Sequence, residues 1–380
     1  MKVSIGSKIF EGPWGGGNLF VKNLANYLKL QNVKVIHDLY DKDIDVIILT
    51  DPRKSSYSAT FSGEDIRKYL NYVNRETLVI HRFNECDERK NTQGVNKLMI
   101  SANKYSDKNI FVSKWLQDLY EKQGLEQKSN QVIMTGADSN IFNNINAINW
   151  DSKSPLKIVT HHWGTNANKG FNDYKKLDAF IGEKNNSNLF EFTYIGNLPD
   201  GYEFNFSKHL KPLHGRELAS ELKKHHVYFT ASKNEPSGNH HIEGAQCGLP
   251  ILYLNSGGIP EFCHNFGLAY DEDNLIDKLF KIKNDYFIYK DKLVDYPYNS
   301  ELMCEEYFEE IVNLIDNKSR ILDKRNSQEN FRSYSKYIFF TKYFLLKLVF
   351  RVRLLTSFYN YFLRGYLKIK SKIITSEKNN

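Results

Sequence analysis

The chain alternates short continuous runs of apolar residues with longer segments in which apolar positions recur at helical spacing. In the first half, the continuous runs predict strands at residues 3–6, 33–37, 45–50, 77–81, 109–113 and 131–135. The periodic segments between them predict helices at residues 18–30, 63–73, 94–105 and 114–123. This alternation is typical of right-handed strand–helix–strand units, which build a doubly wound, mostly parallel sheet.

The same alternation begins again after a polar stretch at residues 143–155, which we interpret as a linker. Strands are predicted at residues 156–161, 189–197, 227–232 and 251–254, with helices at 215–224 and 239–247. Further helices are predicted at residues 275–282 and 302–322, and we expect both to close the second domain. The pattern therefore predicts an α/β protein with two Rossmann-like domains, residues 1–145 and 150–325, and a cleft between them.

The formal net charge of +7 is unevenly distributed along the chain. Residues 330–376 contain ten Lys or Arg and no Asp or Glu, which leaves −3 on residues 1–329 because Glu377 and Lys378 cancel. Within this tail, residues 336–373 interleave aromatic side chains with cations at helical spacing, which predicts basic amphipathic helices. Such helices bind anionic membrane surfaces, with about 1 kcal/mol from each cation. We expect this tail to bind a membrane; the alternative is a closing helix packed on the core.

Other bulk features narrow the class of protein. No nucleic-acid module accompanies the basic tail, so nucleic acid is not an expected partner. The four cysteines are scattered without a CxxC pair, which indicates neither a zinc site nor a disulfide framework. The first residues read as a strand rather than a signal peptide, and no apolar run reaches the ~18 residues of a membrane span. We therefore expect a cytoplasmic protein, peripheral on the inner face of the cell membrane.

Several loops of the first half follow predicted strands and carry candidate binding residues. Three consecutive glycines, residues 15–17, precede the first helix, where backbone N–H groups can approach an anion. His81 and Arg82 follow the fourth strand and could polarise a hydroxyl or a phosphate. Asp51 after the third strand, and Trp14 beside the glycines, complete the acceptor-side candidates with Arg82. The alternatives are a plain flexible turn, a buried structural histidine and a structural arginine.

In the second half, two carboxylates lie eight positions apart, Glu235 before the predicted helix and Glu243 within it. Carboxylates repel phosphate but accept hydrogen bonds from hydroxyls, so the pair indicates a hydroxyl-rich ligand such as a nucleotide-sugar. Lys169, next to a glycine in another loop, can neutralise a diphosphate as a point charge. The alternatives are a solvated pair of acids at a helix start and a surface lysine. His240 and His241 do not predict a metal site, because adjacent helical residues point in different directions.

These residues together resemble the retaining glycosyltransferases of family four. The resemblance covers residues 1 to about 325, and five motifs carry it: Glu235 through Glu243, Ser256-Gly-Gly-Ile-Pro-Glu261, Lys169-Gly-Phe, Gly15-Gly-Gly, and Thr135-Gly-Ala-Asp-Ser-Asn-Ile-Phe142. It implies the GT-B fold, with an acceptor domain followed by a donor domain. It also implies a nucleotide-sugar donor and a reaction that retains the anomeric configuration by front-side attack. No cofactor and no metal are expected.

The resemblance also implies roles for individual residues. Glu243 would bind the ribose hydroxyls, Glu235 would face the donor sugar at the reacting centre, and Lys169 would hold the diphosphate. His81 would contact the sugar near the transferred bond, so Glu235 and His81 are the catalytic candidates. The donor-binding candidates are Gly16, Gly17, Lys169, Glu235, Gly238, Glu243 and Gly257.

One position departs from the family pattern. The family usually carries an arginine five positions before its lysine, and this chain has Gly164 there. A positive charge on the diphosphate is then missing or supplied elsewhere, with Arg82 and Arg216 as candidates. We expect a hexosyltransferase-type enzyme that acts on a glycan or polyprenyl-linked glycan in surface polysaccharide synthesis. The alternatives are a nucleotide-sugar 2-epimerase on the same fold and a catalytically inactive membrane-associated scaffold.

Overall fold

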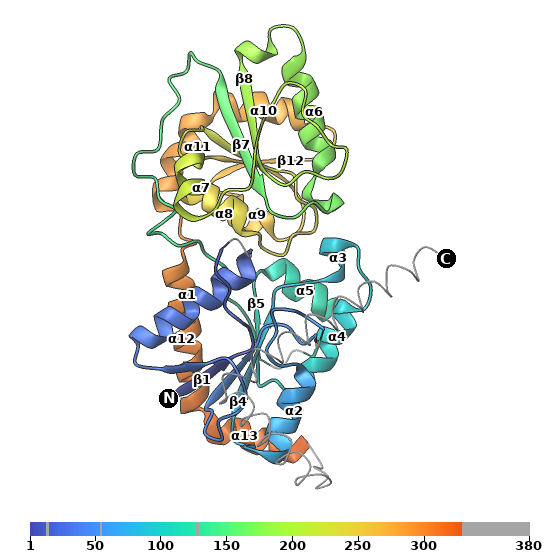
Figure 1. The fold of residues 1–380 in the computed structure, drawn as a ribbon, viewed down its shortest axis with the longest axis vertical. Coiled ribbons are helices and arrows are strands. Elements are labelled where there is room, and N and C mark those ends of the chain that lie inside the picture. Colours follow the sequence, from blue (N-terminus) through green and yellow to red (C-terminus); the bar gives the residue numbers. More distant parts are fainter. Residues whose placement is uncertain (13–14, 54, 127–128, 329–380) are drawn as a thin grey trace, which may run out of the picture.

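The computed structural model describes residues 1–12, 15–53, 55–126 and 129–328 (Figure 1). The chain forms two α/β domains, each built around a six-stranded sheet in which every strand pair is parallel. This confirms the predicted fold class of two Rossmann-like domains. The basic tail lies outside the described residues.

The first sheet has the strand order β2-β1-β3-β4-β5-β6. Its strands are β1 (Lys2–Ile5), β2 (Lys34–Ile36), β3 (Val46–Leu49), β4 (Leu78–Phe83), β5 (Lys108–Phe111) and β6 (Asn130–Val132). The chain reverses direction across this sheet between β1 and β3, and their carboxyl ends are the switch point where ligands bind in such folds.

The second sheet has the strand order β9-β8-β7-β10-β11-β12. Its strands are β7 (Leu156–His162), β8 (Phe190–Gly196), β9 (Lys208–Leu210), β10 (Val227–Thr230), β11 (Ile251–Leu254) and β12 (Gly267–Tyr270). The order matches the dinucleotide-binding Rossmann arrangement, whose switch point lies between the first and fourth strands, here β7 and β10. The sequence pattern did not predict β9 and β12.

Helices cover both faces of each sheet (Figure 1). They are α1 (Gly16–Leu30), α2 (Gly63–Tyr72), α3 (Asp87–Lys90), α4 (Val95–Ala102), α5 (Lys114–Lys122), α6 (Phe171–Gly182), α7 (Gly215–Leu222), α8 (Asn239–Gln246), α9 (Ile259–Cys263), α10 (Leu275–Asn284), α11 (Tyr286–Lys292), α12 (Ser300–Asp316) and α13 (Lys318–Gln328). Short 3₁₀ turns lie at Asn103–Tyr105, Ala167–Lys169, Asn186–Asn188 and Leu293–Asp295. None of these helices is long and apolar enough to cross a membrane.

The last helices correct the predicted domain boundary. Instead of closing the second domain, α12 packs beside α1 on the first sheet (Figure 1). Its buried face presents Met303, Tyr307, Ile311 and Leu314 to the core of the first domain. The predicted single helix at 302–322 is also interrupted, since α12 ends before Asn317 and α13 begins after it. The first domain is therefore built from both ends of the described chain.

Candidate functional site

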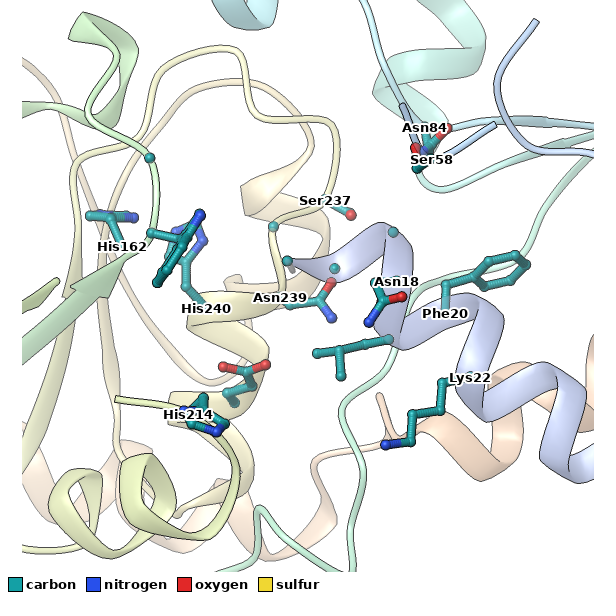
Figure 2. A pocket seen from close by; sticks show the side chains of 18 of the residues that line it. Asn18, Phe20, Lys22, Ser58, Asn84, His162, His214, Ser237, Asn239 and His240 are labelled. Carbon is teal, nitrogen blue, oxygen red and sulfur yellow. The ribbon is translucent and has the colours of Figure 1, made fainter. Parts of the chain in front are cut away.

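A cavity of about 970 Å³ lies between the two domains (Figure 2). Its walls include the segments that follow β1, β3 and β4 on one side and those that follow β7 and β8 on the other. The carboxyl ends of parallel strands are where open α/β sheets bind ligands, and both switch points contribute here. The fold thus directs the loops of both domains toward one site.

Two helix N-termini meet in this cavity. α1 begins after Gly15 and α8 begins after Gly238; neither helix has a side-chain cap or an acidic residue in its first turn. A Cβ atom on Gly16 would lie 2.8 Å from Oδ1 of Asn239, the first residue of α8. Figure 2 shows Asn239 beside the first turn of α1. Uncapped N–H groups and two positive helix ends favour an anionic ligand between them.

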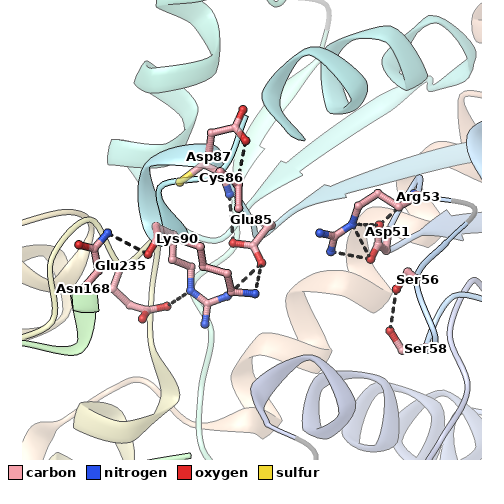
Figure 3. Close-up of polar contacts among 12 residues, drawn as sticks. Asp51, Arg53, Ser56, Ser58, Glu85, Cys86, Asp87, Lys90, Asn168 and Glu235 are labelled. Atoms are coloured by element: carbon pink, nitrogen blue, oxygen red, sulfur yellow. Dashed lines mark hydrogen bonds and ion pairs between the residues drawn. The ribbon is translucent and has the colours of Figure 1, made fainter. Parts of the chain in front are cut away.

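Glu235 is the charged centre of the cavity wall. Its side chain is buried, and its Oε2 accepts a hydrogen bond of 2.6 Å from Lys169 Nζ. Its Oε1 lies 2.7 Å from Nε of Arg89, which belongs to α3 of the first domain. Arg89 Nη1 and Lys90 Nζ each contact Oε2 of Glu85 at 3.1 Å (Figure 3). Two carboxylates and three cations from both domains therefore form one network.

The network controls how its members ionise. Burial opposes the charge on Glu235, yet the pKa of this carboxyl is lowered because Arg89 and Lys169 stabilise the ionised form. Burial lowers the pKa of Lys169, with Glu235 acting in the opposite direction. The pKa of Arg89 is raised, chiefly by Glu235. Glu235 is thus an anion that holds one cation from each domain.

Glu243 faces the same cavity from the next turn of α8. Its Oε2 lies 2.9 Å from Nε2 of His161, at the end of β7. The other ring nitrogen of His161 lies 3.1 Å from the Tyr228 hydroxyl. Glu243 is buried, so this imidazole fixes the orientation of a carboxylate that lines the cavity. Such a carboxylate can accept hydrogen bonds from ligand hydroxyls.

A glycine turn supports Glu235 from behind. The N–H of Gly258 donates to the Glu235 carbonyl at 2.9 Å. Gly257 has a φ of 67°, and a Cβ atom there would lie 2.6 Å from the Glu235 carbonyl oxygen and 2.7 Å from its amide nitrogen. Only glycine combines this backbone conformation with so close an approach. The turn after β11 thereby positions the segment that carries Glu235.

No protein-family model matches this chain, and a search of curated proteins finds no similar sequence. Solved structures are similar over most of its length. Sucrose-phosphate synthase from Thermosynechococcus elongatus has a TM-score of 0.57 at 12% identity, covering 83% of this chain and 99% of its own. HepE from Anabaena, in complex with UDP, has a TM-score of 0.60 at 12% identity, covering 82% and 100%. A glycosyltransferase from Rickettsia africae has a TM-score of 0.57 at 14% identity, covering 83% and 99%.

These structures are GT-B glycosyltransferases, and their similarity extends over both domains. The chain has the GT-B fold. The cavity described above is the cleft between its two halves.

The GT-B cleft gathers most of the residues that the sequence singled out. Gly16, Gly17, Lys169, Gly238, Glu235, Glu243, Asp51 and Arg82 all line the cavity. Gly257 lies behind Glu235, outside the lining residues, and acts on the site through the backbone contacts above. Trp14 lies outside the described residues.

His81 is placed differently from the prediction. Strand β4 extends to Phe83, two residues beyond the predicted end, so His81 is within the strand and fully buried, with its ring centroid 4.2 Å from that of Phe83. Successive strand residues point to opposite faces, and it is Arg82 that lines the cavity. Burial lowers the pKa of His81 to about 3, so the imidazole is neutral. The prediction that His81 contacts the sugar is therefore wrong, because this side chain lies in the interior of the N-terminal domain.

Two of the three acceptor-side candidates, Asp51 and Arg82, already contact neighbouring side chains. Arg53 holds Asp51 through both carboxylate oxygens, with Nε at 2.9 Å from Oδ1 and Nη2 at 2.8 Å from Oδ2 (Figure 3). Arg82 is buried, with its guanidinium carbon 3.9 Å from the centre of the Phe20 ring. Arg82 and Arg216 were the candidates for the positive charge that Gly164 does not supply. Arg82 lines the cavity, whereas Arg216 lies outside its lining.

The sequence pattern missed Arg89, Glu85 and His161. Arg89 lies on a helix of four residues, too short to show a period, and contacts Glu235 only because the domains meet. Among the described residues, no cluster of three or more His, Cys, Asp or Glu side chains could hold a metal ion. His240 and His241 have nearly perpendicular rings, at 87°, and His240 Nε2 lies 2.9 Å from the Thr230 hydroxyl.

Proposed function

We propose that this protein transfers a sugar from a nucleotide-sugar donor to a glycan or polyprenyl-linked glycan, with retention at the anomeric centre, in surface polysaccharide synthesis. The main support for this proposal is that Glu235, Glu243, Lys169 and two uncapped helix N-termini lie together in one cleft. Together these groups match a ligand that has hydroxyls at both ends and a diphosphate in the middle. HepE, one of the similar structures, was solved with UDP and with UDP-glucose, which supports this class of donor.

In this proposal each group binds one part of the donor. Glu243, oriented by His161, accepts hydrogen bonds from the ribose hydroxyls. The backbone N–H groups at Gly16 and Gly17 approach the phosphates, and Lys169 neutralises them. Glu235 faces the sugar next to the bond that breaks. No metal is required, because cations and helix ends supply the positive charge.

The chemistry then depends on stabilising the leaving diphosphate. Negative charge grows on the phosphate oxygen as the bond to the anomeric carbon breaks, and preorganised donors aimed at that oxygen lower the barrier. In front-side attack, the leaving phosphate oxygen helps to remove the proton from the acceptor hydroxyl, which attacks the same face. Asp51 and Arg82 line the opposite wall, where the acceptor would enter.

The test is incubation of the full chain with UDP-, GDP- and other nucleotide-sugars, with binding and hydrolysis measured for each. We expect one donor to bind and to be hydrolysed slowly without an acceptor; no binding and no hydrolysis for any donor would refute the proposal. Glu235→Ala should abolish turnover. Glu272→Ala is the matched control, because Glu272 is an exposed carboxylate paired with Lys233 outside the cavity lining. Isomerised donor without acceptor would favour the 2-epimerase, and donor binding without any turnover the scaffold.

The basic tail, residues 336–373, belongs to the same proposal as a membrane anchor on the inner face of the cell membrane. Nine of the ten cations in residues 330–376 lie within this segment and would bind anionic lipid headgroups. In liposome flotation, the full chain should float with vesicles that contain phosphatidylglycerol and stay behind with neutral vesicles. A chain that ends at residue 330 should lose flotation, and unchanged flotation would contradict the anchor.

A further inference from the structure

The two walls of the cleft differ sharply in their positive charge. Among the described residues, the lining contains seven Lys or Arg side chains: Lys8, Lys22, Arg53, Arg82, Arg89, Lys90 and Lys169. Lys169 is the member that comes from the C-terminal domain; the other six come from the N-terminal domain. A diphosphate carries at least two negative charges, so the C-terminal wall supplies one full cation where two or more are needed.

Arg89 is the N-terminal cation that reaches across the cleft. Its Nε lies 2.7 Å from Glu235 Oε1, on the same carboxylate whose other oxygen holds Lys169 at 2.6 Å. The two cations are therefore separated by the width of a single carboxylate. Lys90 and Arg53, in contrast, pair with carboxylates of their own domain, Glu85 and Asp51.

The backbone around Arg89 is anchored to the C-terminal domain. The side-chain amide of Asn168 donates to the carbonyl oxygens of Glu88 and Arg89, at 3.0 and 3.1 Å (Figure 3). Asn168 is the residue before Lys169, so one short turn fixes the positions of both cations. This arrangement places Arg89 without relying on its long side chain alone.

We propose that Arg89 and Lys169 together bind the donor diphosphate, so that the second diphosphate cation comes from the opposite domain. This inference rests on the proposed function. A guanidinium presents several N–H donors in a planar fork that matches phosphate oxygens. Here Nε lies close to Glu235 but makes no hydrogen bond, while Nη1 donates to Glu85. A diphosphate next to Glu235 offers more negative charge than that carboxylate, and it binds both cations while Glu235 turns to the sugar. Donor binding then also ties the two domains together.

Gly164 provides a direct way to test this assignment. It lines the cavity on the C-terminal wall, and a Cβ atom there would have only the Asn166 side-chain nitrogen within 4 Å, at 3.6 Å. Its φ is not in the left-handed region, so a larger residue fits without backbone strain. Position 164 can therefore receive an arginine that restores the second charge from the C-terminal side.

The experiment measures binding of UDP, GDP, ADP and dTDP to the full chain by calorimetry, and then of the nucleoside of the tightest ligand by competition. Arg89→Ala should weaken the diphosphate about 10- to 100-fold, as expected for losing a charged hydrogen-bond partner, and leave the nucleoside unchanged. Arg89→Lys should lie between the two. Arg67→Ala is the matched control, because Arg67 pairs with Glu64 on α2 outside the cavity lining and should change nothing. Gly164→Arg combined with Arg89→Ala should recover at least part of the affinity.

The possible outcomes distinguish a failure of the role assigned to Arg89 from a failure of the proposed function. If the unmodified protein binds a diphosphate and Arg89→Ala binds it equally well, the assignment of Arg89 is wrong. Equal weakening of diphosphate and nucleoside would also overturn it, because that result indicates a structural role. If Arg89→Ala proves unfolded by its melting curve, Arg89→Lys decides: diphosphate binding as tight as that of the unmodified protein would overturn the assignment. No binding of any nucleotide to the unmodified protein refutes the proposed function itself.

Discussion

The two domains share one architecture and differ in what fills it. The main core of the N-terminal domain is largely aliphatic, with Val3, Ile5 and Ile48 of the sheet packed in one cluster with Leu24 of α1 and the buried face of α12. The main core of the C-terminal domain is much richer in aromatic side chains, which make up nine of its twenty buried residues: Trp150, Phe171, Tyr174, Phe190, Phe192, Tyr194, Phe229, Tyr270 and Tyr286. Equivalent parallel sheets are thus stabilised by different side-chain chemistry, which shows that the layer pattern rather than the residue type sets the fold.

The difference continues at the cleft. The N-terminal wall supplies six of the seven lining cations, whereas Glu235, Glu243 and the buried histidines of the site belong to the C-terminal domain. One domain therefore contributes charge that attracts an anion, and the other contributes groups that accept or orient hydrogen bonds. The site is complete only when both walls are present.

The largest expected difference between the two domains is the stability that each loses on acidification. Among the described residues, burial lowers the pKa of five C-terminal histidines and two N-terminal ones. These are His162, His225, His226, His240 and His241, against His37 and His81. For His225 and His226 the pKa falls to about 4, so the unfolded chain takes up protons between pH 6.5 and 4 that the folded chain does not. Stability is lost as the pH falls through this window, by about 1.5 kcal/mol per histidine between pH 6.5 and 5.

With three more such histidines, the C-terminal domain should lose more stability than the N-terminal domain at pH 5. Urea unfolding at pH 7 and pH 5, followed by peptide-resolved hydrogen exchange, measures the free energy of each domain. His226→Asn keeps an acceptor for the Lys157 N–H and removes one titrating group, so it should reduce the acid slope of the C-terminal domain by about one proton. Equal acid slopes in both domains would contradict this prediction.

Removing a core ring from α12 should destabilise the N-terminal domain, although this helix follows the whole C-terminal domain in sequence. Tyr307 is buried, and its ring centroid lies 5.1 Å from that of Phe20 in α1. Tyr307→Ala should lower the free energy of unfolding by about 3–5 kcal/mol, as large-to-small core changes do. Tyr286→Ala is the matched control, because Tyr286 packs on Trp150 in the C-terminal core. Hydrogen exchange should rise in β1 and β3 for the first variant and in β7 and β10 for the second.

These helices show where sequence patterns stop being informative. Strands such as β3 and β11 are continuous apolar runs, buried on both faces, and their positions followed from the pattern. The edge strand β9 has largely exposed residues, and β12 begins with a glycine, so neither gave a strand signal. The apolar face of α12 was visible, but amphipathicity does not identify the sheet on which a helix packs.

The site could be predicted to a similar extent. Lys169, Glu235 and Glu243 follow strands or begin a helix, and parallel sheet geometry brings such positions together. The position of His81 could not be obtained, because β4 continues for two residues beyond its predicted end, and within a strand only alternate side chains face the cleft. Arg89 could not be predicted for another reason. Its contact with Glu235 joins the two domains, and no local sequence pattern encodes such a contact.

Two glycines near the cleft, one from each domain, should respond in opposite ways to an added methyl group. Gly257→Ala places a Cβ atom 2.6 Å from the Glu235 carbonyl oxygen at a φ of 67°, so it should cost about 1–3 kcal/mol of stability through strain. Gly17→Ala, in the first turn of α1, has nothing within 4 Å of its Cβ position and favours the helix by about 0.5–1 kcal/mol. Thermal melting should show a loss of stability for Gly257→Ala and no loss for Gly17→Ala. Gly17→Ala should still weaken diphosphate binding if the N-terminal wall approaches the phosphates; unchanged affinity would assign the triple glycine to the turn alone.

The smallest expected effect concerns another contact that joins the domains. Glu261 of α9 accepts hydrogen bonds from the N–H groups of Lys114 and Trp115, at 2.7 and 2.6 Å, and so caps α5 of the opposite domain. Glu261→Ala should cost about 0.5–2 kcal/mol, as the loss of a cap does. Ser62→Ala removes a cap of α2 within the N-terminal domain and should cost a similar amount.

The two variants should differ in what else they change. Because the Glu261 contact spans the cleft, its loss should widen the distribution of distances between the domains, measured by single-molecule fluorescence with one dye on each domain. Ser62→Ala should leave that distribution as it is. If Glu261→Ala also leaves the distance distribution unchanged, the contacts of Glu235 and Asn168 with α3 suffice to hold the two walls together. The N-terminal domain, which provides Arg89, is then positioned by these contacts alone.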